Sequence, residues 1–141
     1  MKKTIQTVNQ VNAPLDKVWA KVGPGTNMDK WMPIVATCRV EGDKRICGTH
    51  EAGDLKETIL KSDDKNKVFQ YRIDEQSMLP VTNIIGTMTL SEKNGGTQLN
   101  WDVEFDISEE NAGAFEEIKT NTEGLYQMAA TSLAEYVNAQ N

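Results

Sequence analysis

The amino-acid sequence predicts an α+β fold in which an antiparallel β-sheet is covered on one face by a long C-terminal helix. Short apolar runs separated by turn residues extend from Pro33 to Ile107, which is typical of strands joined by hairpins. The last run alternates strictly between apolar and polar residues, as in a sheet with one buried face. Residues 115–136 then carry apolar side chains three or four positions apart, as in a helix that packs on such a face.

A short helix is predicted near the N-terminus, after a first strand. The segment NAPLDKVWAKV places Pro14 at the first helical position, where a missing backbone N–H costs nothing. One face of this helix carries apolar residues at the spacing i, i+3, i+4 and i+7, namely Leu15, Val18, Trp19 and Val22. The segment GPGTN ends the helix.

The later strands are predicted in the runs IVATCRV, RICGTH, DLKETILK, VFQYRID, TNIIGTMTL and QLNWDVEFDI. Asn94 and Gly95 give the clearest hairpin signal between two of them. Period-2 alternation points three sets of side chains toward the buried face: Phe69, Tyr71 and Ile73; Ile84, Gly86 and Met88; and Leu99, Trp101, Val103, Phe105 and Ile107.

The C-terminal helix is expected to start after Ser108, a capping residue, and to run for roughly 30 residues or about 45 Å. Its apolar stripe consists of Phe115, Ile118, Thr122, Leu125, Ala129, Leu133 and Tyr136. Small residues lie on or beside this stripe at Thr122, Gly124, Ala129 and Ala130. Together with Gly86 they leave room for a cavity unless Trp101, Tyr71 and Met128 fill it.

Length and charge limit the classes of function. The 141 residues show no break in composition, so we expect a single domain over residues 1–141. The net charge of −6 argues against nucleic acid or an anionic membrane as partner, since both require a basic surface. The polar N-terminal segment lacks the apolar core of a signal peptide or membrane helix, which favours a cytoplasmic protein.

The cysteine and histidine content gives no sign of a metal site. Cys38 and Cys47 flank EGDK, and a turn at Gly42 and Asp43 would place them directly opposite each other on a hairpin. Because cytosolic thiols are normally reduced, we expect two small buried side chains rather than a disulfide. His50 is the single histidine, so neither metal nor cofactor binding is expected.

These elements in this order resemble the START/Bet v 1-like (SRPBCC) superfamily, and most closely its bacterial polyketide cyclase/dehydrase and lipid-transport-like branch. The resemblance covers the whole chain and lies in NAPLDKVWAKV, KWMPIV, VFQYRID, LPVTNIIGTMTL and TQLNWDVEF. It implies a helix-grip fold, in which a curved antiparallel sheet wraps around the long C-terminal helix and two short helices follow the first strand. It also implies a largely apolar cavity between sheet and helix.

The resemblance further implies which side chains line that cavity. The matching positions are Leu55, Glu57, Tyr71, Ile73, Ile84, Gly86, Met88, Trp101, Ile118, Thr122 and Leu125. Trp31, Met32 and Ile34 of KWMPIV would form part of the wall. The entrance would lie between THEAGD, which contains His50, and SMLPVT, which contains Met78, Leu79 and Pro80.

Glu57 and Tyr71 are the candidates for chemistry. Glu57 alternates with Leu55 and Ile59, so an inward Glu57 would be a buried carboxyl group whose raised pKa suits acid or base work. Alternatively it hydrogen-bonds Tyr71 or faces water. Tyr71 either donates to a ligand carbonyl or packs in the core. Several methionines form either an adaptable lining or core filler: Met28, Met32, Met78, Met88 and Met128.

The sequence leaves three functions open. The first is binding of a small hydrophobic, lipid-like or polyketide-like molecule by a monomer or homodimer. The second is a cofactor-independent cyclase, dehydratase or lyase, in which Glu57 removes a proton next to a carbonyl and Tyr71 polarises the oxygen. The third is a protein-interaction module.

Overall fold

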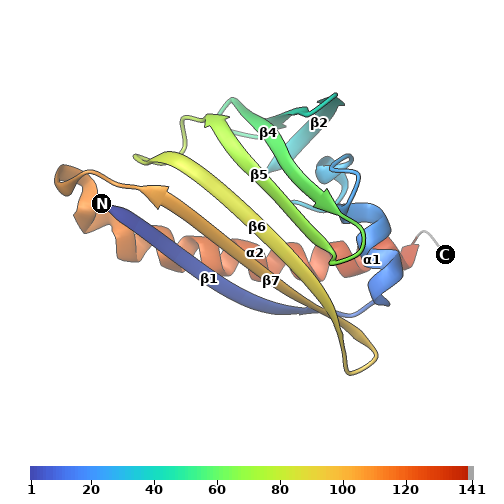
Figure 1. Ribbon diagram of the computed structural model, residues 1–141. Helices are drawn as coiled ribbons and strands as arrows, with labels where there is room; N and C mark the ends of the chain where they lie inside the picture. The colour runs from blue at the N-terminus through green and yellow to red at the C-terminus, as the bar shows by residue number, and fades with distance from the viewer. Residues whose placement is uncertain (140–141) are drawn as a thin grey trace.

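A computed structural model describes residues 1–139 of the chain. Seven strands form one antiparallel sheet in the order β1-β7-β6-β5-β4-β3-β2, and the sheet curves around the long helix α2 (Figure 1). This confirms the predicted α+β fold. The strands are β1 (Lys2–Val11), β2 (Val35–Glu41), β3 (Lys44–Thr49), β4 (Asp54–Asp63), β5 (Val68–Glu75), β6 (Thr82–Lys93) and β7 (Gly96–Asp106).

Two short helices follow β1, as predicted. They are α1 (Leu15–Val22) and the 3₁₀ helix η1 (Met28–Lys30), which consists of one turn. Pro14 precedes α1 with extended backbone angles (φ −62°, ψ 144°), so it is the N-cap residue and the helix begins one position later than predicted. α1 buries Val18, Trp19 and Val22, and Trp19 Nε1 donates a hydrogen bond to Asp64 Oδ1 at 2.7 Å. α1 packs against α2 at the C-terminal end of the long helix (Figure 1).

Two hairpin turns place the strands as the sequence predicts. Asn94 (φ 54°) and Gly95 (φ 78°) connect β6 to β7, and their positive φ angles are those that a tight two-residue hairpin requires. Between β2 and β3, a turn at Gly42 and Asp43 sets Cys38 directly opposite Cys47.

The long helix differs from the prediction at its start and on one face. Ser108 caps the 3₁₀ segment η2 (Glu109–Ala114), its Oγ accepting from Asn111 N at 3.3 Å, and α2 (Phe115–Ala139) begins only after it. Met128 is 60% exposed and fills no cavity. The buried face of α2 carries Ala129, Ala130 and Leu133 instead. None of the helices within residues 1–139 is long and apolar enough to cross a membrane.

Gly86 on β6 makes room for a side chain and not for a void. It pairs with Tyr71 on β5, and a Cβ atom at Gly86 would overlap the Tyr71 ring. The ring of Tyr71 therefore lies over the glycine and is 5% exposed. The volume that the sequence suggested at Gly86 is occupied by Tyr71.

Replacing this glycine should destabilise the fold. Gly86→Ala forces the Tyr71 ring to move, and we expect the free energy of unfolding to fall by about 1–3 kcal/mol, as for other overpacked cores. Urea denaturation measures the change. Gly124→Ala on the exposed side of α2 is the matched control and should be neutral or stabilising by up to about 1 kcal/mol. Equal effects of the two substitutions would contradict the close packing of Tyr71 on Gly86.

Candidate functional site

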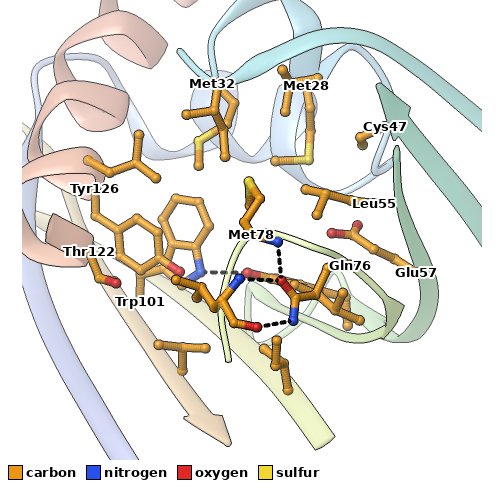
Figure 2. Close-up of a pocket in the computed structure, with 18 of the residues that line it drawn as sticks. Met28, Met32, Cys47, Leu55, Glu57, Gln76, Met78, Trp101, Thr122 and Tyr126 are labelled. Carbon is orange, nitrogen blue, oxygen red and sulfur yellow. Dashed lines mark hydrogen bonds between the residues drawn. The ribbon is translucent and has the colours of Figure 1, made fainter. Parts of the chain in front are cut away.

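A pocket of about 110 Å³ lies between the inner face of the sheet and α2. Figure 2 shows side chains from the sheet, from the segment around η1, from the β5–β6 loop and from α2 converging on it. Twelve residues that the sequence placed at a cavity are among those that line it: Met32, Ile34, Leu55, Glu57, Tyr71, Ile73, Leu79, Ile84, Trp101, Ile118, Thr122 and Leu125.

Five other residues expected at the cavity do not line this pocket. Trp31 is buried beside Trp101 (ring centroids 6.2 Å apart) and packs behind the wall. Met88 is buried elsewhere in the core, and Gly86 is covered by Tyr71. His50 and Pro80 are exposed, because the loops that carry them turn toward solvent.

Eight lining residues were not among the expected set: Met28, Val35, Cys47, Gln76, Met78, Val103, Phe105 and Tyr126. The alternation of β7 already pointed Val103 and Phe105 inward, and Met28 and Met78 belonged to the methionines suggested as an adaptable lining. Tyr126 lies four positions after Thr122, so helical spacing was a usable signal for it. No local pattern in the sequence points to Gln76.

Three aromatic side chains form a polar cluster in the pocket wall. Tyr126 stacks on Trp101 with ring centroids 3.8 Å apart and an interplanar angle of 7°. Trp101 Nε1 donates a hydrogen bond to the Tyr71 hydroxyl at 3.1 Å. The Tyr126 hydroxyl acts as a donor toward the same Tyr71 oxygen, and this contact lowers the pKa of Tyr71 and raises that of Tyr126. Burial raises the pKa of Tyr71 to about 12 and that of Tyr126 well above its ordinary value, so both phenols are neutral and keep their protons.

The hydrogen bonds of this trio leave one proton over. Trp101 supplies one N–H and each tyrosine supplies one O–H, but two hydroxyls in contact share only one proton. The Trp101 N–H and the Tyr126 O–H are both directed at the Tyr71 oxygen. The O–H of Tyr71 itself makes no hydrogen bond as a donor to another group within residues 1–139. The pocket therefore offers one hydroxyl donor to a bound molecule.

Glu57 is buried, as the sequence predicts, but its partner is Arg45. The two residues lie opposite each other on β4 and β3, and Arg45 Nε donates to Glu57 Oε1 at 2.5 Å, with both side chains at most 4% exposed. Arg45 Nη1 also donates to Gly25 O at 3.2 Å, and its guanidinium lies 5.1 Å from the centre of the Phe69 ring. Of the alternatives that the sequence left open for Glu57, neither the hydrogen bond to Tyr71 nor exposure to water is found.

This ion pair decides the protonation chemistry of Glu57. Burial raises the pKa of the Glu57 carboxyl above its ordinary value, while the Arg45 guanidinium opposes that shift. A carboxylate held at 2.5 Å by a guanidinium has one oxygen committed to that contact and is a weaker base than a free buried carboxylate. The Glu57 carboxylate, paired with Arg45, thus lies at a fixed position in the pocket wall.

The loop between β5 and β6 is held over the pocket by the side chain of Gln76. Its Oε1 accepts from the backbone N–H groups of Met78 and Leu79, both at 2.8 Å, and its Nε2 donates to the carbonyls of Leu79 (2.9 Å) and Val81 (3.3 Å). Figure 2 shows Gln76 hydrogen-bonded within this loop and the Met78 side chain directed into the pocket. Gln76 therefore positions the two lining residues Met78 and Leu79.

Within the described part of the chain, no group of three or more His, Cys, Asp or Glu side chains could hold a metal ion. The pocket itself contains one carboxyl group and one thiol, Glu57 and Cys47, and the carboxyl is already paired with Arg45.

Residues 2–138 match the protein family described as polyketide cyclase / dehydrase and lipid transport. The chain belongs to this family. The match confirms the resemblance to START/Bet v 1-like proteins that the order of elements suggested. No curated protein matches the sequence.

Solved structures share the fold at low sequence identity. A protein from Thermobifida fusca is 22% identical with a TM-score of 0.77, over 96% of this chain and 93% of the other. Norcoclaurine synthase from Thalictrum flavum is 17% identical with a TM-score of 0.76, over 98% and 87%. Ara h 8.0201 is 16% identical with a TM-score of 0.73, over 99% of both chains. These neighbours support the helix-grip fold of this family member.

Removing one partner of the buried ion pair should destabilise the protein strongly. Glu57→Gln leaves the Arg45 guanidinium buried without a counter-charge, so we expect a loss of about 3–5 kcal/mol in the free energy of unfolding, measured by urea denaturation. The exposed pair Lys56–Glu75 provides the matched control, and Glu75→Gln should cost less than about 1 kcal/mol.

Removing both partners separates pairing from packing. The double variant Arg45→Met/Glu57→Leu carries no buried charge and should recover most of the stability that Glu57→Gln loses. If Glu57→Gln unfolds at the same urea concentration as the wild type, the pair does not have the role described here.

Proposed function

We propose that this protein binds a small, largely apolar molecule that carries an oxygen acceptor, such as a carbonyl group. The observation that carries the proposal is the pocket with an apolar wall and a single unused hydroxyl proton on the Tyr71–Tyr126 pair. An apolar cavity with few, well-placed polar groups is the usual form of a small-molecule site. Membership of a family described by cyclase, dehydrase and lipid-transport activities supports the same class of ligand.

The size of the pocket limits the ligand unless side chains move. At about 110 Å³ the pocket is smaller than a cavity of roughly 150 Å³ that takes up benzene in another protein. Three lining residues, Met28, Met32 and Met78, are unbranched, and their thioethers change rotamer at low cost. We therefore expect single-ring ligands to enter after rotation of one or two of these methionine side chains, and lipid-like or polyketide-like ligands to require a larger displacement of all three.

Binding without catalysis is favoured over the cyclase or dehydratase alternative. That alternative needs Glu57 as an acid or base, whereas one carboxylate oxygen is bonded to Arg45. Tyr71 is left as an electrophilic donor without a matched base in the pocket. The interaction-module alternative finds little support, because the exposed large apolar residues in the described range lie scattered over β1, β4, the β5–β6 loop and α2.

Filling the pocket should abolish binding. Leu125→Trp places a bulky ring in the pocket from α2, and we expect at least about a tenfold loss of affinity for ethylbenzene, measured by chemical-shift titration of ¹⁵N-labelled protein. The matched control is Met128→Trp, three residues along the same helix on its exposed side, which should bind as the wild type does. Urea denaturation of both variants shows whether they fold. Unchanged affinity in a folded Leu125→Trp variant would place the ligand elsewhere.

The hydroxyl donor should distinguish two ligands of the same shape. Acetophenone and ethylbenzene differ mainly by a carbonyl oxygen, and we expect the wild type to prefer acetophenone. Tyr71→Phe removes the free O–H, and the donors that it releases on Trp101 and Tyr126 lie at other points of the pocket wall. We expect acetophenone binding to weaken by about five- to tenfold while ethylbenzene binding is unaffected, because one hydrogen bond contributes about 1 kcal/mol. Equal losses for both ligands would indicate a packing effect and contradict the proposed contact.

A further inference from the structure

Two free cysteines face each other at one edge of the sheet, between β2 and β3. Cys38 and Cys47 are register partners, and their sulfur atoms are 3.7 Å apart. Cys47 is fully buried and lines the pocket, whereas Cys38 is half-buried on the edge strand β2. The pair therefore connects the pocket wall with a position that small molecules in solvent can reach.

The backbone geometry suits a disulfide. Residues directly opposite on antiparallel strands have Cα atoms about 4.5–5.5 Å apart, which lies inside the range of about 4.4–6.8 Å found across disulfides. A disulfide needs a sulfur separation of about 2.0 Å, and the present 3.7 Å can close by side-chain rotation. No shift of strand register is required.

The surroundings make the two thiols unequal. Cys47 donates its S–H to the sulfur of Cys38, and this hydrogen bond is the main cause that lowers the pKa of Cys38 to about 6. Arg45 on β3 lowers this pKa further, while burial and the Asp29 carboxylate of η1 oppose the shift. The same hydrogen bond, together with burial, raises the pKa of Cys47. Cys38 is thus the more acidic of the two thiols, and because it is also the more exposed one it is the better nucleophile.

We propose that Cys38 and Cys47 form a dithiol site that reacts with low-molecular-mass disulfides of the glutathione type and closes to a disulfide in the wall of the pocket. The Cys38 thiolate attacks one sulfur of the small disulfide, forms a mixed disulfide and releases one small thiolate. The Cys47 sulfur then attacks the Cys38 sulfur, and its proton passes to the departing second small thiol. Two protein thiols are oxidised while one small disulfide is reduced to two thiols.

The site is independent of the ligand proposed above, because its reaction requires only the two sulfurs and their neighbours. Arg45 couples it to the pocket, since the guanidinium that lowers the Cys38 pKa is the one paired with Glu57. Oxidation moves the Cys47 sulfur toward β2 and away from the lining.

The test is to incubate the folded protein with glutathione disulfide, to block the remaining thiols with N-ethylmaleimide, and to measure the mass. We expect the wild type to lose both thiols together without retaining glutathione. Cys47→Ser should stop at an adduct of one glutathione on Cys38, because the second sulfur is missing. Cys38→Ser should react at least about tenfold more slowly than Cys47→Ser, because its remaining thiol is buried and has a raised pKa.

A pH profile separates this chemistry from simple proximity. The rate of Cys38 alkylation by iodoacetamide, followed by peptide mass analysis, should rise with a midpoint near pH 6 in the wild type. In Cys47→Ala the midpoint should move toward about pH 8.5, the ordinary value of a free thiol.

Three results would overturn the proposal. The first is separate glutathione adducts on both cysteines of the wild type. The second is equal rates for Cys38→Ser and Cys47→Ser. The third is a disulfide that forms only in urea, where the hairpin is unfolded. An unchanged alkylation midpoint in Cys47→Ala would contradict the activation of the Cys38 thiol by its hydrogen bond from Cys47.

Discussion

The ion pair between Arg45 and Glu57 is the constraint on which the inner face of the sheet depends. Burying two charges is costly, so each must keep the other at hydrogen-bond distance, and this fixes β3 against β4. Arg45 also holds the carbonyl of Gly25 in the loop after α1 and lies against the rings of Phe69 and Tyr71. A single guanidinium thereby fixes the pocket carboxyl, packs against the Tyr71 ring of the polar trio and lowers the pKa of the nearby Cys38 thiol.

The pocket combines rigid and adaptable parts, and they come from different elements. The sheet supplies the fixed polar groups, because Trp101, Tyr71 and Glu57 are buried and hydrogen-bonded. The methionines come from the segment after α1 and from the β5–β6 loop, which Gln76 holds through four hydrogen bonds. Such a division keeps the donor in one place while the volume around it adapts, which suits recognition of one functional group on apolar bodies of different shape.

The sequence predicted the features that depend on local pattern. Alternation placed Trp101 and its neighbours on the inner face, and the turns at Asn94–Gly95 and Gly42–Asp43 set two hairpin registers. Arg45 was not found, because its pairing with Glu57 depends on the β3–β4 register across an irregular loop that has no diagnostic turn. Trp31, Met88 and Gly86 were misplaced for a related reason: all are buried, but three-dimensional packing decides which buried residues border empty space.

The pairing of the first strand with the last one also bears on how the molecule is made. Lys2 pairs with Asp106 and Val11 with Thr97, and the N-terminal ammonium donates to Ile107 O at 3.1 Å, so β1 stays at the sheet edge only once β7 exists. The helix that closes the pocket comes later still in the chain. During synthesis on the ribosome the inner face therefore remains open to water until α2 has emerged. Closure of such distant contacts is intrinsically slow. A hydrophobic molecule present at that moment could be enclosed as the fold completes, without having to enter past Met78.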